Sequence, residues 1–366
     1  MPQPCVLRHG SHAAPVHART TASRPLASMD ALRALAILGV ICLHTGPFYT
    51  ADIRFDPAWQ VVAQFCIATL ALFAVPFFFA ASGYFFGLAH QRNKDIVGTA
   101  KRFLGRVLLL IVAWNALYGV FQHSLFKGEW SPGAVLRLGI PGMAADMRTA
   151  PLHILLHGSS YQLWFLTALA MAALTVACVV RLHGARFLPV LAAAIYGIGL
   201  LGQSYHAFHW PVRSPLNTLV GPFFGTPLFT LGYVLSFRDL RRTHMDAVLI
   251  CGGLALLCLE RFVITVRLAW PDGHYFLGSV PLAAGLVRFA ANHPDWLRRT
   301  PLPALGRLTL GVYAIHVAIM HAVDALYLPI MDLPVWQFLL PLVVYGFSIA
   351  LVWLLARIPA LARVLL

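Results

Sequence analysis

Long apolar runs are the feature that most limits what this chain of 366 residues can fold into. A helix needs about 20 mostly apolar residues to cross a bilayer. Only 11% of the residues are charged, against about 25% in an ordinary soluble domain, so a soluble fold of this composition could not cover its surface. The sequence therefore predicts an all-α fold, a polytopic membrane bundle of about ten transmembrane helices. The candidate segments are residues 31–49, 59–88, 104–122, 161–181, 187–203, 216–237, 246–264, 275–291, 308–328 and 336–358.

The chain divides into a short N-terminal tail, residues 1–28, and one membrane domain, residues 29–366. The tail is polar, with several Arg, His and Pro residues and no acid. It lacks the apolar core of a cleavable signal peptide, and we expect it to be disordered and without a function of its own. The true start of the protein is either Met1 or Met29. No long polar block remains that could form a second globular unit.

The distribution of lysine and arginine predicts how the bundle is oriented. If the N-terminus is cytoplasmic and the ten helices alternate, the cytoplasmic segments hold 20 of the 27 Lys and Arg residues and the other face holds seven. Cytoplasmic loops of membrane proteins are enriched in these residues. Both termini are therefore expected in the cytoplasm. One missed or invented helix would reverse the later loops but not the first two.

Charge and cysteine content exclude other classes of partner. The formal net charge is +14, but the basic residues are scattered between apolar runs and are not gathered on one amphipathic element, so no nucleic-acid partner is expected. The six cysteines show no paired spacing, and five of them lie in apolar runs. Neither a disulfide framework nor a metal site is expected from that pattern. Membrane lipid is the partner that the composition predicts.

The first apolar segment carries charge where charge is costly and usually functional. In "MDALRALAILGVICLHTG", residues 29–46, Arg33 and His44 are 11 residues apart. At the rise and rotation of an α-helix they differ in depth by roughly 16 Å and lie within about 20° of the same face. Arg33 is expected near the cytoplasmic entrance, with Asp30 one turn before it as a pairing partner. His44 is expected in the outer half of the membrane.

Each of these two residues has a structural and a functional interpretation. Arg33 is either an anchor that extends to lipid headgroups or a ligand for phosphate, which a guanidinium binds bidentately. His44 is either a helix-end histidine bonded to a neighbour or a group for proton transfer near neutral pH. Their shared face favours a path that leads from the cytoplasm into the membrane.

The second segment and the basic loop after it would extend this path. Pro76 lies inside the second segment, where we expect a kink. Ser82 and Gly83, in "PFFFAASGYFF", fall at about the depth of Arg33, and small residues there allow the approach of another helix or of a ligand. Lys101, Arg102 and Arg106 follow at the membrane surface, where they would hold anionic lipid headgroups or the phosphates of a soluble cofactor. These three residues lie at the end of "HQRNKDIVGTAKRFLGR", residues 90–106.

Five motifs, in order along the chain, resemble the acyltransferase family 3 membrane enzymes. "MDALRALAILGVICLH" resembles the first-helix signature of an Arg followed after ten residues by a His. The segments "VPFFFAASGYFFG", "KRFLGR" and "YQLWFLTAL" resemble the Phe-rich, basic and Leu-Trp-Phe-Leu segments of that family. "LGRLTLGVYAIH", residues 305–316, resembles its Gly-x-x-(Ser/Thr)-x-x-x-Tyr-x-x-His segment. Each motif alone is weak, but the ordered set is specific.

The resemblance implies a multi-pass enzyme of the bacterial inner membrane. Such enzymes move an acyl group, commonly acetyl, from cytoplasmic acyl-CoA to a hydroxyl of a carbohydrate or glycolipid acceptor, often a precursor of a surface polysaccharide. Acyl-CoA would be a co-substrate, and no permanently bound cofactor is expected. By this resemblance His44 takes the catalytic position, while Arg33, Arg102 and Arg106 take positions linked to donor binding or catalysis.

The chain departs from the family pattern in two places. Its basic motif has three residues between Arg102 and Arg106 where the family usually has two, so either Lys101 or Arg102 fills the first place. The family often carries a His before the Leu-Trp-Phe-Leu segment, and this chain has Gln162. A role that requires an imidazole at that position is in doubt.

The mechanism expected from these residues places the CoA phosphates against the arginines and threads the pantetheine arm past Ser82 and Gly83. His44 would then act as general base on an acceptor hydroxyl; a covalent acyl-His intermediate is the alternative. Glu260 is a candidate to orient His44, or it pairs with Arg261 or Arg267. Three further residues have both a site role and a packing role open to them: Trp164 and Tyr313, which could stack on a sugar ring, and His316 near mid-membrane.

A secondary transporter or flippase for a polysaccharide or small molecule is the main alternative function. Transporters also bury a few ionisable groups in a pathway, but many contain inverted repeats with matching helix breaks. The sequence offers one candidate break, at Pro76, and no matching partner. A membrane-bound O-acyltransferase of the other large family would use a buried His with an Asn or Asp and would lack the Arg-x10-His pattern.

Overall fold

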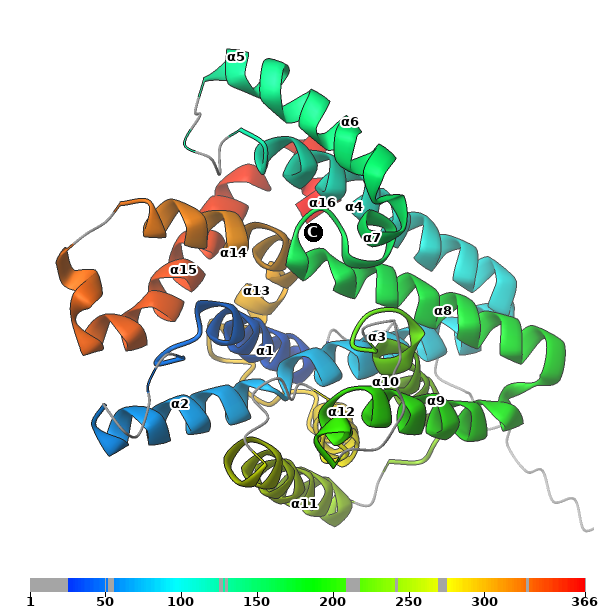
Figure 1. The fold of residues 1–366 in the computed structure, drawn as a ribbon. Coiled ribbons are helices and arrows are strands. Elements are labelled where there is room, and N and C mark those ends of the chain that lie inside the picture. The colour runs from blue at the N-terminus through cyan, green and yellow to red at the C-terminus, as the bar shows by residue number, and fades with distance from the viewer. Residues whose placement is uncertain are drawn as a thin grey trace, which may run out of the picture.

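The computed structural model describes residues 26–49, 51, 56–124, 128, 131–208, 218–240, 243–268, 275–326 and 329–365. All regular secondary structure within these ranges is helical (Figure 1). The predicted tail therefore falls almost entirely outside the described residues. The predicted all-α class is confirmed.

Eleven helices correspond to the ten apolar segments, because the second segment forms two. They are α1 (Ala27–Thr45), α2 (Ala58–Ala71), α3 (Ala74–Asn93), α4 (Ile96–Phe121), α8 (Trp164–His183), α9 (Leu188–Gly202), α10 (Pro222–Ser236), α11 (His244–Arg261), α12 (Ser279–Asn292), α14 (Thr309–Asp324) and α15 (Pro334–Leu355). Shorter helices connect them: α5 (Pro132–Ala134), α6 (Ile140–Thr149), α7 (Pro151–His157), α13 (Leu302–Gly306) and α16 (Pro359–Leu365). A single 3-10 turn, η3 (Tyr161–Leu163), precedes α8.

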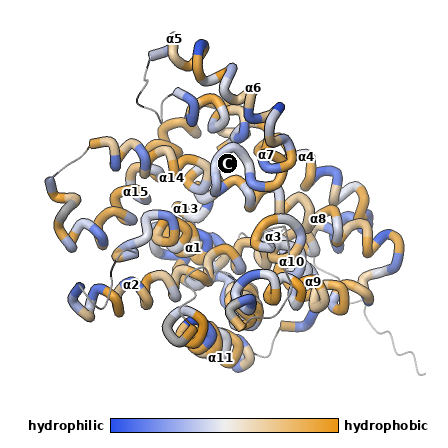
Figure 2. The backbone as a smooth tube through the Cα atoms, viewed as in Figure 1, coloured by the Kyte–Doolittle hydropathy of each residue, from blue (hydrophilic) through white to orange (hydrophobic). Residues whose placement is uncertain are grey.

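Seven helical segments in the described part of the chain are long and apolar enough to cross a membrane. Apolar residues run along nearly every long helix, as Figure 2 shows. Many of them face outward, including Val112, Leu174, Val190 and Val248, and lipid is the environment in which such a surface is stable. The remaining apolar helices α10, α12 and α14 have 15, 14 and 16 residues, and so fall short of the about 20 that a full crossing needs.

Pro76 interrupts the second apolar segment as expected, but the break lies N-terminal to it. The chain leaves helical hydrogen bonding at Leu72 and Phe73, between α2 and α3. Proline has no N–H, so Pro76 cannot donate to the carbonyl of Leu72, the acceptor four residues earlier. The Phe77 N–H resumes the pattern by donating to Phe73 O at 3.0 Å.

Helices α3 and α10 pack backbone to backbone. A Cβ atom added at Gly83 would lie 1.9 Å from the carbonyl oxygen of Phe229, and one added at Gly232 would lie 1.8 Å from that of Ala80. Only glycine permits this approach. Of the two roles predicted for the small residues of α3, Gly83 therefore has the first, contact with another helix.

Helix α1 lies in the interior of the bundle and packs against α2, α3, α13, α14 and α15 (Figure 1). Its contact with α13 is as close as that of α3 with α10, because a Cβ at Gly306 would lie 1.8 Å from Asp30 O. This packing brings the start of α1 beside the turn that follows α13. The C-terminal end of α1 lies beside α14. Both charged positions of α1 are thereby set against residues of the C-terminal third of the chain.

Candidate active site

One cavity of about 590 Å³ extends along α1 and is lined by both Arg33 and His44. Cavities of this size hold small-molecule ligands and cofactors. Because the two residues are separated by roughly 16 Å of helix, the cavity reaches from one end of α1 toward the other. Its other polar lining residues are Ser82, Arg102, Arg106, Gln162, Trp164, Arg307, Thr309 and Tyr313.

Arginines gather at the end of the cavity where α1 begins. Arg33, Arg102, Arg106 and Arg307 line it, and no acid is among its described lining residues. Asp30 is the nearby counter-charge: its Oδ1 lies 3.3 Å from Arg33 Nη1, and it also interacts with Arg307. Four guanidinium groups with one adjacent carboxylate leave a net positive charge, which suits a multiply charged anion such as a phosphate ester.

Arg33 is held in place from two sides. Besides its ion pair with Asp30, its guanidinium lies over the ring of Phe85 at 5.0 Å from the centroid. Arg106 is close enough to repel it electrostatically. A bound anion between the two would relieve that repulsion, which supports the predicted donor-binding interpretation of Arg33.

The distal part of the cavity holds a pair of histidines. His44 Nδ1 lies 2.8 Å from His316 Nε2, and the two rings are stacked with centroids 4.9 Å apart. His44 is half-buried and lines the cavity, whereas His316 is fully buried. The ring of Tyr161 meets that of His44 edge-on at 5.0 Å. His316 therefore lies behind His44, which separates it from the cavity.

Backbone carbonyls fix which nitrogens of this pair carry protons. His316 Nδ1 lies 2.7 Å from Tyr313 O and 3.3 Å from Val312 O, and a carbonyl oxygen can only accept, so Nδ1 carries the hydrogen. In the neutral ring Nε2 is then an acceptor, and His44 Nδ1 donates to it. The lone pair of His44 consequently lies on Nε2, the arrangement that a general base requires.

Two predicted aromatic residues also line the cavity. Trp164 packs with Phe79 and Phe224, at 6.2 and 6.4 Å between centroids. Tyr313 packs with Phe165 at 5.6 Å, and its hydroxyl donates to the backbone carbonyl of Gln162. Both side chains are thus held by neighbours while presenting a surface to the cavity.

Three cavity residues were given no role by the sequence. Arg307 stood inside the quoted motif "LGRLTLGVYAIH", and its place beside Asp30 follows from the close packing of Gly306 on α1. Thr309 is in the same motif. Gln162 was noted only as a departure from the family pattern. The signal that could have identified Arg307 is its position two residues before the apolar helix of the motif.

Glu260 is not the partner of His44, contrary to prediction. Its carboxylate accepts hydrogen bonds from the Tyr205 hydroxyl at 2.5 Å and from the backbone N–H groups of Leu277 and Gly278 at 2.9 and 2.7 Å. These bonds satisfy a buried acid at the turn that precedes α12. The alternative pairing with Arg261 is not found either, because that side chain donates to Thr69 at 3.1 Å; the side chain of Arg267 lies outside the described residues.

Two other predicted donor-binding residues do not line the cavity. Gly83 faces the backbone of α10, so it contributes helix packing and not ligand contact. Lys101 is exposed on α4 and is absent from the lining, while Arg102 and Arg106 are present. Of the two candidates for the first place of the basic motif, only Arg102 lines the cavity.

Comparison with known proteins gives one family and two relatives. A family model described as an acyltransferase domain matches residues 26–357, nearly the whole chain. Two curated relatives from Enterococcus faecalis, both named amino-acid racemase, are similar to it. One is 25% identical over 354 residues, which cover 88% of this chain and 45% of the relative; the other is 25% identical over 232 residues, which cover 59% and 29%. The chain thus spans less than half the length of these relatives. No solved structure matches it.

Proposed function

We propose a function from one premise, that this chain belongs to the acyltransferase family 3 of membrane proteins. In this proposal the protein takes an acyl group from acyl-CoA and transfers it to a hydroxyl of a carbohydrate or glycolipid acceptor. Acetyl is the acyl group that we propose. The observation that carries this proposal is a single cavity that joins four arginines to a histidine poised as a base.

The donor occupies the cavity from the arginine end. Acyl-CoA carries its phosphates at one end and its thioester at the other, joined by a long, thin arm. Arg33, Arg102, Arg106 and Arg307 bind the phosphates, and the arm passes Ser82 and the apolar lining toward His44. The charged part of the donor never has to enter the membrane, since only the arm does.

The histidine pair performs the proton transfers. His44 Nε2 removes the proton from the acceptor hydroxyl as that oxygen attacks the thioester carbonyl carbon. A new C–O bond forms, the C–S bond breaks, and the proton passes from His44 to the leaving sulfur. His316 accepts the hydrogen bond from Nδ1 throughout and stabilises the imidazolium. A covalent acyl-His44 intermediate is the alternative: a C–N bond to His44 forms as the C–S bond breaks, and the acceptor oxygen then forms the C–O bond as the C–N bond breaks.

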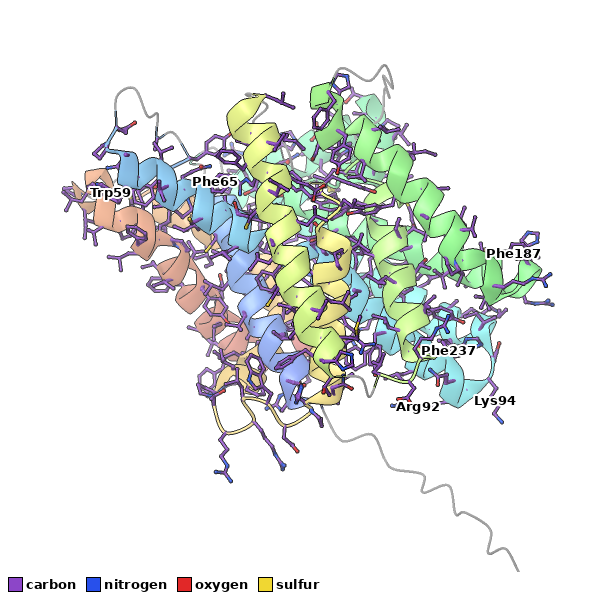
Figure 3. All side chains as sticks on the ribbon, turned by 90° about the horizontal axis from the view of Figure 1, so that it is seen from below. Trp59, Phe65, Arg92, Lys94, Phe187 and Phe237 are labelled. Carbon is purple, nitrogen blue, oxygen red and sulfur yellow. The ribbon has the colours of Figure 1, made fainter. Side chains whose placement is uncertain are left out.

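The arginine end of the cavity faces the cytoplasm in this proposal. Acyl-CoA is a cytoplasmic metabolite, and the Lys and Arg bias of 20 to seven places the start of α1 and α4 on that side. Arg92 and Lys94 lie at one end of the molecule and Trp59 lies toward the other, as Figure 3 shows. The protein would thus be a multi-pass component of the bacterial inner membrane with both termini inside.

The function is tested with radiolabelled acetyl-CoA and bacterial membranes that contain the full chain, since these supply membrane-bound acceptors. Wild-type protein should release CoA and transfer label to membrane material, and His44→Gln should do neither while inserting equally well. General-base catalysis contributes about 10² to 10⁴ in rate, so the loss should be of that order. No CoA release by the wild type would overturn the proposal and favour a transporter; full turnover by His44→Gln would overturn the role of His44.

A further inference from the structure

Gln162 carries a polar group that the fold itself does not satisfy. Its side chain is 1% exposed and lines the cavity, and its amide nitrogen Nε2 has no hydrogen-bond partner among the described residues. A buried donor without an acceptor lowers the stability of the fold, because the group has lost its water and gained no partner. Such a cost is retained where a ligand supplies the acceptor.

The rest of the Gln162 side chain is fixed. The Ser160 hydroxyl donates to Oε1 at 2.5 Å, which orients the amide and leaves Nε2 as its unsatisfied end. The Tyr118 hydroxyl approaches the same side chain, but it forms no hydrogen bond with Nε2 and donates its own hydrogen to Ala314 O at 2.6 Å. The amide is therefore preorganised without being occupied.

Three contacts connect Gln162 to the histidine pair. Its backbone carbonyl accepts from the Tyr313 hydroxyl. The carbonyl of Tyr313 in turn accepts from His316 Nδ1 at 2.7 Å. The preceding residue, Tyr161, places its ring against His44. Gln162 and the proposed base thus belong to one bonded unit that borders the cavity.

We propose that Gln162 is a catalytic residue whose Nε2–H donates to the thioester carbonyl oxygen of the acyl donor, an inference that rests on the proposed acyltransferase function. As the acceptor oxygen attacks the carbonyl carbon, the C=O π pair moves onto the oxygen and Gln162 stabilises the resulting negative charge. The pair then returns, the C–S bond breaks, and the proton held by His44 goes to the CoA sulfur. The products are the ester and CoA.

An amide suits this position because it donates without titrating. A hydrogen-bond donor directed at a developing oxyanion stabilises it more strongly in a buried, water-poor site than in water. A hydrogen bond that is stronger in the transition state than in the bound thioester raises kcat and leaves KM unchanged. A neutral imidazole also carries an N–H donor, so a histidine at this position would keep the hydrogen bond.

The test compares Gln162→Leu, Gln162→Glu and Gln162→His in the acetyl-CoA assay on membranes that contain the full chain. Gln162→Leu removes the donor at similar volume and should lower kcat about 10²- to 10³-fold, with KM for acetyl-CoA unchanged. Gln162→Glu should be at least as poor, because it offers an acceptor and a negative charge. Gln162→His should recover much of the loss.

A matched control is available in α8, five residues after Gln162. Thr167 is also buried, and its hydroxyl has no hydrogen-bond partner within the described part of the chain, but it does not line the cavity. Thr167→Val should therefore leave both kcat and KM unchanged. Binding of acetyl-CoA, measured by equilibrium binding to each purified variant, should be equal in all of them.

The outcomes separate this inference from the proposed function. If the wild type turns over and Gln162→Leu keeps its kcat, the inference is overturned and the proposed function stands. If Gln162→Leu raises KM or abolishes acetyl-CoA binding with kcat intact, Gln162 is a ground-state contact and the inference is again overturned. If the wild type releases no CoA, the proposed function fails, and the inference fails with it.

Discussion

The orientation of His44 is determined by two backbone carbonyls that it does not touch. Val312 O and Tyr313 O hold the hydrogen of His316 on Nδ1, and this makes Nε2 of His316 the acceptor for His44. In serine hydrolases a buried aspartate sets the tautomer of the catalytic histidine. Here a neutral imidazole can do so, because its own tautomer is fixed by the backbone of α14. No charge has to be buried for the purpose.

Substitutions at His316 should separate orientation from packing. His316→Gln places an amide oxygen near the position of Nε2, where it accepts from His44 Nδ1, so this variant should keep measurable turnover. His316→Leu offers no acceptor and should lose about 10²-fold or more in kcat, with KM for acetyl-CoA unchanged. Steady-state CoA release by the two variants is the measurement. Equal kcat in both variants would show that the hydrogen bond to His316 plays no part.

Arg307 should contribute to donor affinity and not to chemistry. Arg307→Gln removes one of the four cavity guanidiniums, and a charged hydrogen bond is worth about 1.5–3 kcal/mol, so KM for acetyl-CoA should rise about tenfold or more with kcat little changed. Arg298→Gln is the control, since Arg298 is exposed, pairs with Asp295 at 3.2 Å and does not line the cavity. An unchanged KM in Arg307→Gln would remove Arg307 from the binding site.

Long-range contacts explain which site residues could be predicted and which could not. Arg33 and His44 were predictable, because their shared face follows from spacing along one helix. The partner of His44 was not, because it lies 272 residues away on α14. Glu260 was predicted because a catalytic histidine is commonly oriented by a carboxylate. Its oxygens instead accept hydrogen bonds from the backbone N–H groups of Leu277 and Gly278. Sequence spacing carries no information about those bonds.

At the scale of helices, apolar length was a good guide to position because hydropathy is a local property. All ten predicted segments contain a helix, and the break before Pro76 follows from the missing N–H. The sequence was a poorer guide to which neighbour each helix face contacts. The stretch around Ser82 and Gly83 predicted close approach without saying of what, and the structure divides it: Ser82 lines the cavity, while Gly83 contacts α10.

The α3–α10 contact should be sensitive to a single methyl group. Gly83→Ala places a Cβ 1.9 Å from Phe229 O in the present backbone, so the helices must separate, and overpacking of this kind typically costs about 1–3 kcal/mol. The thermal midpoint of the detergent-solubilised protein should fall. Gly252→Ala on α11 is the matched control, because nothing lies within 4 Å of the new Cβ; it should not lower the midpoint. A Gly83→Ala midpoint equal to that control would contradict the close packing.

For the whole molecule, the proposed function predicts one orientation in the membrane, with the arginine end of the cavity in the cytoplasm. Lys94 follows α3 and Tyr49 follows α1, so the two residues should lie on opposite faces. In a background without the native cysteines, Tyr49→Cys should react with an impermeant maleimide in intact cells. Lys94→Cys should react only after the membrane is opened. The reverse pattern would place the arginines outside, away from the acyl-CoA pool.

The histidine pair also has a consequence for how the protein is made. His44 is synthesised early, in α1, and enters the membrane long before its partner in α14 exists. The two histidines are 272 positions apart in the sequence. Until the second is synthesised, the imidazole of His44 lacks the neighbour that sets its tautomer, and the part of the cavity wall formed by Arg307 and Tyr313 is missing. If His44 is the base that we propose, a ribosome-bound chain is inert toward acyl-CoA until α14 inserts, and the contact with His316 delays the chemistry until assembly is nearly finished.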